Sequence, residues 1–338
     1  MASRSTAGAT SDRPVPTTMT TNLHPAVAAY LADSAAMDLR PYVDLAPADA
    51  RTQFASVMAA RLGADHQPRP MAEVVDRTVA VDGRDIPLRL YRPSTSISTS
   101  TATRPVMPTV VFFHGGGWVI GDLETHDALC RRIADGLPAV VVAVDYCRAP
   151  EAPFPAPVED AAAATRWVAA HVAELGGDPD ALVVAGDSAG AAMATVVARR
   201  ARDTGTPRLA AQLLLYPVTD LTMSHASYVE MGTGYGLTAE TMAWFIDHYA
   251  GPVEDPDASP MAAEDLAGLP AAVVTTADHD PLRDEGDAYA RRLADAGVPT
   301  VHHRHEGLIH AYALMETVPI AMEAITDDLS ALRGVLAA

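Results

Sequence analysis

The chain has few cysteines, few basic residues and no long apolar run. Two cysteines, Cys130 and Cys147, cannot form a disulfide framework in 338 residues, which is typical of a reducing cytoplasm. The apolar runs are shorter than the roughly 18 residues that cross a bilayer. The 24 Lys and Arg residues against 43 Asp and Glu residues give a net charge of −19, which repels nucleic acid and anionic membranes. We therefore expect a cytoplasmic protein that binds neither nucleic acid nor membranes.

The first third of the chain contains helical and strand patterns between two polar stretches. Residues 1–21 lack the apolar core of a secretion signal and are expected to form a disordered tail. Apolar residues at helical spacing within 23–62 predict two helices. Asp82-Gly83 interrupts the alternating stretch 74–91 and predicts a hairpin. The Ser/Thr-rich stretch 94–104 is expected to be a mobile surface loop.

The remainder of the chain alternates short apolar runs with helical segments. This pattern predicts a mostly parallel central sheet flanked by helices, in an α/β fold. The predicted strands are 109–113, 139–144, 182–185, 211–216, 271–276 and 300–305, and the predicted helices are 126–136, 157–175, 189–204, 239–249, 284–296 and 320–335.

The segment 219–269 does not follow the alternation and is rich in Met and aromatic residues. We interpret it as an insertion above the carboxyl edge of the sheet, where such folds bind ligands. The predicted organisation is cap helices over 22–62, a core over 63–218 and 270–338, and a cap insertion over 219–269.

Gly186, Ser188 and Gly190 form a Gly-x-Ser-x-Gly motif where a predicted strand turns into a predicted helix. The motif is the nucleophile elbow of α/β-hydrolases. Such a turn strains the backbone of its central residue, and only small neighbours let the chains approach. The helix N-terminus also supplies N–H groups that favour a developing negative charge. Ser188 is therefore the candidate nucleophile.

A serine nucleophile needs a base, and the base needs an acid that orients it. In α/β-hydrolases the chain order is Ser, then the acid after a strand, then His after the last strand. Asp278 and Asp280 both follow the predicted strand 271–276, so both are candidates for the acid. His310 follows the last predicted strand and is the candidate base.

His302, His303 and His305 lie within the last predicted strand and are expected to point along its alternating faces, away from Ser188. His303 and His305 share a face, but nothing near them in the sequence supplies convincing further metal ligands. We interpret them as surface histidines and predict no metal site and no cofactor.

Three consecutive glycines follow the first strong strand, in the sequence His114-Gly115-Gly116-Gly117-Trp118. Their value is exposed N–H groups that a ligand can approach closely. With the N–H of Ala189 they predict an oxyanion hole. A phosphate-binding loop is the alternative, but the chain has neither the P-loop motif nor a dinucleotide-binding motif after its first strand.

His-Gly-Gly-Gly-Trp at 114–118 and Gly-Asp-Ser-Ala-Gly at 186–190 resemble the hormone-sensitive-lipase-like family of bacterial carboxylesterases. Segments 121–127, 280–286 and 307–310 match as well, in the family's order, and the resemblance runs from about residue 23 to the C-terminus. It implies an α/β-hydrolase fold with a helical cap, and a homodimer through the edge of the last strand. It also implies Asp280 as the triad acid and Gly116, Gly117 and Ala189 as the oxyanion donors.

The segment 146–151 departs from the family's usual Tyr-Arg-Leu-Ala-Pro-Glu, because it reads Tyr-Cys-Arg-Ala-Pro-Glu. We expect the displaced arginine to loosen the support beneath the glycine loop, and Glu151 to anchor the loop by hydrogen bonding. Asp187 either supports the loop or caps the following helix. Cys147 is a poor alternative nucleophile, since no base follows it at a matching position. The predicted supporting residues are His114, Gly115, Trp118, Asp187 and Glu151.

These observations predict a serine carboxylesterase for short- to medium-chain esters, which acts on a small-molecule substrate through Ser188, His310 and Asp280. Acyl transfer, amide cleavage and lactone cleavage are open alternatives, because cap shape and water exclusion decide the acceptor. A ligand-binding protein on this scaffold is a further alternative, which the presence of all three triad residues disfavours.

Overall fold

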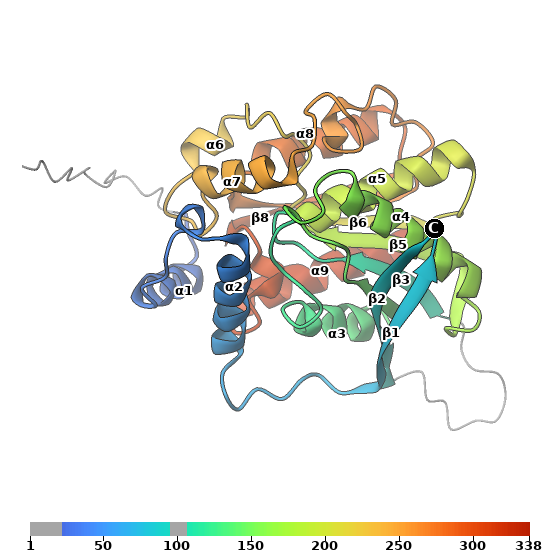
Figure 1. Cartoon of the computed structure of the whole chain (residues 1–338), viewed down its shortest axis with the longest axis horizontal. Helices are drawn as coiled ribbons and strands as arrows, with labels where there is room; N and C mark the ends of the chain where they lie inside the picture. Colours follow the sequence, from blue (N-terminus) through green and yellow to red (C-terminus); the bar gives the residue numbers. More distant parts are fainter. Residues whose placement is uncertain (1–21, 95–106) are drawn as a thin grey trace, which may run out of the picture.

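The computed structural model describes residues 22–94 and 107–338 (Figure 1). The tail predicted over 1–21 and residues 95–104 of the predicted loop lie outside the described residues. Within the described part, eight strands form one sheet in the order β1-β2-β4-β3-β5-β6-β7-β8. All neighbouring pairs from β4 to β8 in this order are parallel, which confirms the predicted α/β-hydrolase fold class.

The sheet begins with the predicted hairpin. β1 (Met71–Val81) and β2 (Arg84–Pro93) are antiparallel, and Val81 pairs with Arg84 across the turn. Asp82 has φ 51° and Gly83 has φ 75°, the positive values that the two central residues of a tight hairpin turn require. The Asp-Gly signal is therefore confirmed.

Parallel strands and covering helices make up the rest of the core. The remaining strands are β3 (Met107–Phe113), β4 (Val140–Val144), β5 (Gly177–Asp187), β6 (Ala211–Leu215), β7 (Ala271–His279) and β8 (Thr300–Ile309). The covering helices are α3 (Asp127–Gly136), α4 (Ala156–His171), α5 (Ala189–Thr204), α8 (Arg283–Asp295) and α9 (Pro319–Leu336). β8 ends the sheet, and the homodimer expected through its edge stays a prediction.

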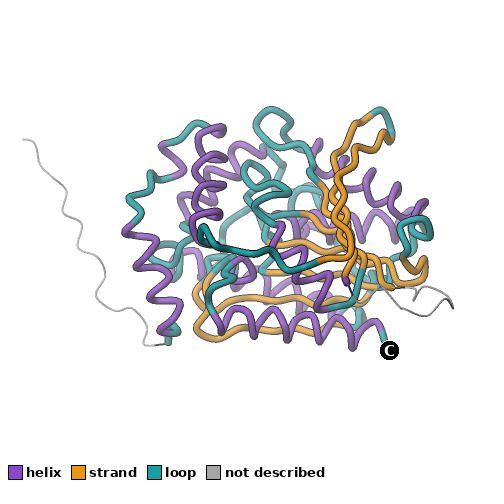
Figure 2. The backbone as a smooth tube through the Cα atoms, turned by 90° about the horizontal axis from the view of Figure 1, so that it is seen from below, coloured by secondary structure: helices purple, strands orange, loops and turns teal. Residues whose placement is uncertain are grey.

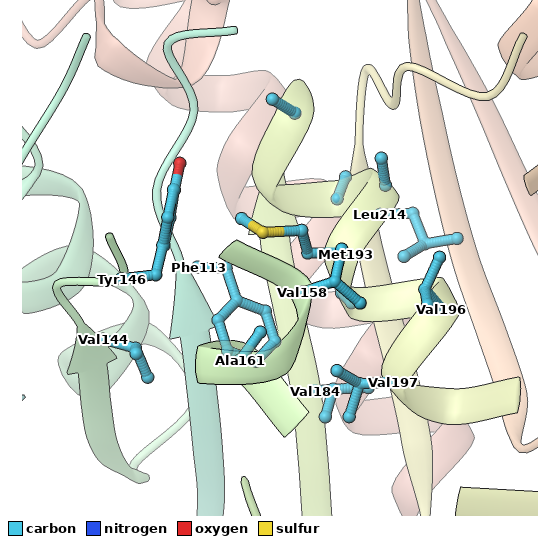
Figure 3. Packing of buried hydrophobic residues seen from close by; sticks show 14 of the residues in the cluster. Phe113, Val144, Tyr146, Val158, Ala161, Val184, Met193, Val196, Val197 and Leu214 are labelled. Carbon is cyan, nitrogen blue, oxygen red and sulfur yellow. The ribbon is translucent and has the colours of Figure 1, made fainter. Parts of the chain in front are cut away.

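Successive side chains of the central strands pack into two different cores. Val111 and Phe113 of β3 lie in the core that contains α4 and α5, whereas Val110 and Phe112 lie in the core that contains α3 and α9. All four side chains are fully buried, so the strand reads as a continuous apolar run instead of alternating with polar residues. Figure 2 shows helices on both sides of the strands, and Figure 3 shows Phe113 beside side chains from α4 and α5.

Four strands, β3, β5, β7 and β8, are longer than predicted, and the added residues of β7 and β8 place the catalytic candidates. β7 continues to His279 and β8 to Ile309, with His279 paired to Ile309 beyond a register shift. Asp278 therefore lies inside a strand, contrary to the prediction that it follows one. Asp280 and His310 each come directly after a strand, at the carboxyl edge where Ser188 also lies.

The predicted cap segments lie on the side of Ser188. The N-terminal segment forms α1 (Pro25–Ala36), a 3-10 turn (Tyr42–Asp44) and α2 (Pro47–Leu62), and the segment 219–269 contains α6 (Ser227–Glu230), α7 (Ala239–Tyr249) and a 3-10 turn (Pro260–Ala262). The two segments meet where the ring of Tyr42 stacks on Trp244, with their centroids 6.5 Å apart. Figure 1 shows α1 and α2 in blue and α6 and α7 in gold near one end of the sheet.

Candidate active site

Ser188 stands on a strained turn between β5 and α5. Its φ of 55° and ψ of −120° lie in a region that non-glycine residues rarely adopt. A Cβ on Gly186 would lie 2.3 Å from the carbonyl carbon of Gly190, and a Cβ on Gly190 would lie 1.9 Å from the carbonyl oxygen of Phe113. Both positions exclude any side chain, which is the steric reason for the Gly-x-Ser-x-Gly pattern.

Ser188, His310 and Asp280 form a continuous chain of hydrogen bonds. His310 Nε2 is 3.0 Å from Ser188 Oγ, and His310 Nδ1 is 2.8 Å from Asp280 Oδ2. The other carboxylate oxygen of Asp280 accepts the N–H of Leu282 at 2.8 Å, so the carboxylate is held in place. Asp280 is fully buried and Ser188 is 6% exposed, so the chain runs from the interior to an accessible hydroxyl.

The structure distinguishes between the two candidate acids. Asp278 accepts a hydrogen bond from Arg304 Nε at 2.9 Å and a longer one from the N–H of Gly307 at 3.3 Å. Its carboxylate is therefore engaged at the end of β8, and it is Asp280 that reaches His310.

The three strand histidines also have partners away from Ser188. His302 lies 3.1 Å from Asp287 of α8, whereas His303 and His305 both approach Asp328 of α9. The third group that the sequence near His303 and His305 does not supply is Asp328. Asp328 is distant along the chain, and α9 brings it to the strand, so sequence proximity gave no signal.

The glycine loop runs beside Ser188 in a conformation that needs glycine. Gly116 and Gly117 have φ of +115° and +58°, and a Cβ on Gly117 would lie 2.1 Å from the ring of Phe245. The N–H of Gly115 donates to Asp187 Oδ1 at 2.7 Å. Asp187 was predicted either to support the loop or to cap the following helix, and this hydrogen bond is a contact of the first kind.

Aromatic side chains pack beneath and beside this loop. The hydroxyl of Tyr146 donates to the carbonyl of His114 at 2.7 Å, and the two rings stack with centroids 4.2 Å apart. Burial holds the pKa of His114 well below its ordinary value, so this imidazole is neutral. Trp118 stacks on Tyr249 of α7 at 4.0 Å, which ties the end of the loop to the segment 219–269.

Three groups support the loop where the sequence departs from the family pattern. Arg148 donates to the carbonyl of Gly121 at 2.5 Å, and Arg51 of α2 donates to the carbonyls of Val119 at 2.7 Å and Ala149 at 2.8 Å. Glu151 pairs with Arg51 through both carboxylate oxygens. The loosening expected from the displaced arginine stays a prediction, and Glu151 reaches the loop through Arg51 instead of binding it directly.

Cys147 is a weak nucleophile in this arrangement, because its thiol resists deprotonation. Burial, with a further contribution from Asp160, raises the pKa of its thiol to about 12. The thiolate is the reactive form of cysteine, and it is scarce at neutral pH when the pKa is this high.

A cavity of about 270 Å³ lies between Ser188 and the predicted cap. Its lining includes Ser188, His310, Gly116 and Gly117. Most of the other side chains are apolar and come from the N-terminal segment 22–62, the segment 219–269 and the residues just after His310, among them Leu31, Tyr42, Phe54, Val57, Met58, Leu237, Met242, Phe245, Leu314 and Met315. Such a lining suits an uncharged apolar ligand whose polar centre faces Ser188.

A mostly parallel sheet with a strained serine elbow, followed in order by Asp280 and His310, defines an α/β-hydrolase. Residues 110–314 match the family described as the alpha/beta hydrolase fold. The esterase LipI of Mycobacterium tuberculosis is 46% identical over 274 residues, which is 79% of this chain and 83% of LipI. An ethyl acetate hydrolase of Pseudomonas putida is 35% identical over 307 residues, which is 88% of this chain and 94% of that protein.

Comparison with solved structures also places the chain among the esterases of this fold. The crystal structure of a thermostable esterase from Pseudomonas putida matches with a TM-score of 0.86 and 39% identity, and the match covers 94% of this chain and 99% of that one. The chain belongs to the hormone-sensitive-lipase-like family of α/β-hydrolases and is a carboxylic ester hydrolase. Within the described residues, no helix is both long enough and apolar enough to span a membrane.

Proposed function

We propose that the protein is a serine carboxylesterase in which Ser188 is the nucleophile, His310 the general base and Asp280 the orienting acid. The observation that carries this proposal is the hydrogen-bond chain from Ser188 Oγ through His310 to Asp280, with distances of 3.0 and 2.8 Å, beside a strained elbow. Nucleophile, base and orienting acid within hydrogen-bond reach are the requirement for serine acyl transfer.

Acylation begins when Ser188 Oγ attacks the ester carbonyl carbon and its proton passes to His310 Nε2. The buried Asp280 carboxylate accepts the Nδ1–H of His310, which fixes the tautomer and stabilises the imidazolium that forms. The carbonyl oxygen becomes an oxyanion, for which the N–H groups of Gly116, Gly117 and Ala189 are the proposed donors. Ala189 is the first residue of α5, and N–H groups of a first helical turn lack acceptors within the helix.

The second half of the reaction clears the acyl-enzyme. Acylation has ended with His310 donating its proton to the leaving alkoxide as the C–O bond broke, so the imidazole is again neutral. It then accepts a proton from water as the water oxygen attacks the acyl carbon. When the tetrahedral species collapses, the proton returns to Ser188 Oγ and the carboxylic acid departs. Neither step requires a metal or an organic cofactor.

We also propose that α1 and α2 together with the segment 219–269 form a cap that limits the acyl chain to short and medium lengths. The cavity of about 270 Å³ is small, and the ring of Phe245 packs directly against Gly117. The Pseudomonas putida relative is an ethyl acetate hydrolase by name, which supports a short-chain substrate as well.

Hydrolysis of p-nitrophenyl esters from acetyl to palmitoyl, with Ser188→Ala in parallel, tests both parts. We expect activity to peak at short or medium chains, to fall steeply for palmitoyl, and to vanish in the variant. A matched Phe245→Ala variant is expected to move the peak toward longer chains, because it enlarges the cavity next to the glycine loop. Retained turnover in folded Ser188→Ala would overturn the nucleophile, and a palmitoyl optimum would overturn the cap's role.

A further inference from the structure

His303 and His305 lie on one face of β8, with the carboxylate of Asp328 from α9 between them. His303 Nδ1 is 2.8 Å and His305 Nε2 is 2.9 Å from the same oxygen, Asp328 Oδ1. The three candidate ligand atoms lie within 4.8 Å of one another. Residues two apart on a strand share a face, so β8 presents the two imidazoles as a pair. None of the three residues lines the cavity of Ser188.

We propose that His303, His305 and Asp328 bind a divalent transition-metal ion, with Zn²⁺ the best match. Two imidazoles and one carboxylate suit Zn²⁺, and three protein ligands leave a fourth position for water. Ligand bonds of about 2.0–2.1 Å place tetrahedral ligand atoms roughly 3.3 Å apart. Each N···O distance must therefore open by only about half an ångström, which the partly exposed side chain of His303 allows.

A fixed outer layer orients the carboxylate ligand. Tyr312 donates its hydroxyl hydrogen to the second oxygen, Asp328 Oδ2, at 2.6 Å. The same tyrosine oxygen lies 2.8 Å from Thr275 Oγ1 on β7, so the tyrosine is itself held in place. Asp328 and Tyr312 are fully buried. Metal sites characteristically hold their ligands through hydrogen-bonded partners of this kind.

The cluster is open to solvent on its outer side. A surface depression is lined by His303, His305 and the exposed Asp327, together with His302, Arg304, Ser330 and Ala331. The guanidinium of Arg304 is paired with Asp278 and Asp287. The Asp327 carboxylate and the net charge of −19 both favour entry of a cation.

The competing explanation is a purely structural cluster, in which the two imidazoles donate hydrogen bonds that compensate the buried carboxylate of Asp328. Both explanations predict the same hydrogen bonds in the absence of metal. The two explanations differ in the Zn²⁺ affinity that they predict. A metal site binds Zn²⁺ tightly, whereas a purely structural cluster binds it no more tightly than other surface histidine pairs do.

The test is competition for Zn²⁺ against a chromogenic chelator at neutral pH, using the full chain. We expect about one tight Zn²⁺ per chain, and a visible absorption band of tetrahedral character when Co²⁺ is added instead. The variants His303→Gln and His305→Gln are expected to weaken binding by more than about 100-fold, beyond the 10–100-fold typical of changes in outer-layer partners. His302→Ala is the matched control, because it removes a neighbouring imidazole on the opposite face of β8 and leaves affinity unchanged.

Thermal stability provides a second readout, and neither readout depends on catalysis. Zn²⁺ is expected to raise the melting temperature of the wild type, since it binds the folded chain, and to leave that of His303→Gln unchanged. Both variants keep Asp328 and Tyr312, so they are expected to fold. Absence of tight Zn²⁺ binding by the wild type, or binding that survives in both glutamine variants, would overturn the proposal in favour of the structural cluster.

Discussion

Replacement of Asp280 by Asn tests whether Asp280, and not Asp278, is the acid that orients His310. The amide has the shape of the carboxylate and can still accept the N–H of Leu282, which lies 2.8 Å from Asp280 Oδ1. Its NH₂ group would then face His310 Nδ1 and donate to it. The neutral imidazole would carry its proton on Nε2, where it can no longer accept the proton of Ser188.

The expected loss is large because Asp280 is fully buried and contacts His310 at 2.8 Å, where water does not replace it. The equivalent change in a serine protease costs about 10⁴-fold in kcat, which corresponds to about 5 kcal/mol of barrier. We expect a similar loss here, measured as kcat on p-nitrophenyl butyrate with folding checked by circular dichroism.

Asp278→Asn is the matched control. It loses a charge that pairs with Arg304, whereas the carboxylate that hydrogen-bonds to His310 is that of Asp280. We expect its kcat to stay close to that of the wild type, because the lost ion pair lies outside the hydrogen-bond chain of Ser188, His310 and Asp280. Equal losses in the two variants, or a small loss in Asp280→Asn, would refute the assignment of the acid.

Two further predictions concern stability. Arg51→Met removes the donors to the carbonyls of Val119 and Ala149, and we expect it to lower the unfolding free energy by about 1–3 kcal/mol in urea titrations. Glu151→Gln changes a carboxylate that is 61% exposed and is expected to cost less than about 1 kcal/mol. Equal costs would contradict the anchoring role of Arg51. Burial raises the pKa of Glu285 well above its ordinary 4.5, so the carboxyl binds a proton more tightly in the folded chain than in the unfolded one. The contribution of this carboxyl to wild-type stability therefore falls as the pH rises above about 4.5. The side chain in Glu285→Gln can still accept the N–H of Thr219, but it no longer titrates. We therefore expect the unfolding free energy of Glu285→Gln, relative to that of the wild type, to rise from pH 5 to pH 8. A difference in unfolding free energy that stays constant with pH would contradict the raised pKa.

The sequence predicts the fold well where a local signal exists. The Asp82-Gly83 turn has the two positive φ values that its residue types suggest, and α5 and α7 begin and end where predicted. The ends of β7 and β8 were underestimated, because pairing with a neighbouring strand extends them beyond their apolar runs. That extension explains why chain position alone left Asp278 and Asp280 as equal candidates, and why only the family resemblance favoured Asp280.

Contacts between distant segments could not be predicted in this way. Arg51 lies in α2, a hundred residues before Glu151, and no motif marks it as the group that holds the glycine loop. Asp328 lies in the last helix, and only the packing of α9 against β8 brings it to His303 and His305. In both cases the partner is set by how the helices cover the sheet, and helical periodicity does not carry that information.

The most direct test of the account is to locate the covalent intermediate. The wild type is treated with a p-nitrophenyl alkyl phosphonate, and the amount of p-nitrophenolate released per chain is measured by absorbance. The modified peptide is then identified by mass spectrometry. We expect about one equivalent of p-nitrophenolate per chain and a single adduct on Ser188, with neither in Ser188→Ala. An adduct on another residue, or full release by folded Ser188→Ala, would contradict the proposal that Ser188 is the nucleophile.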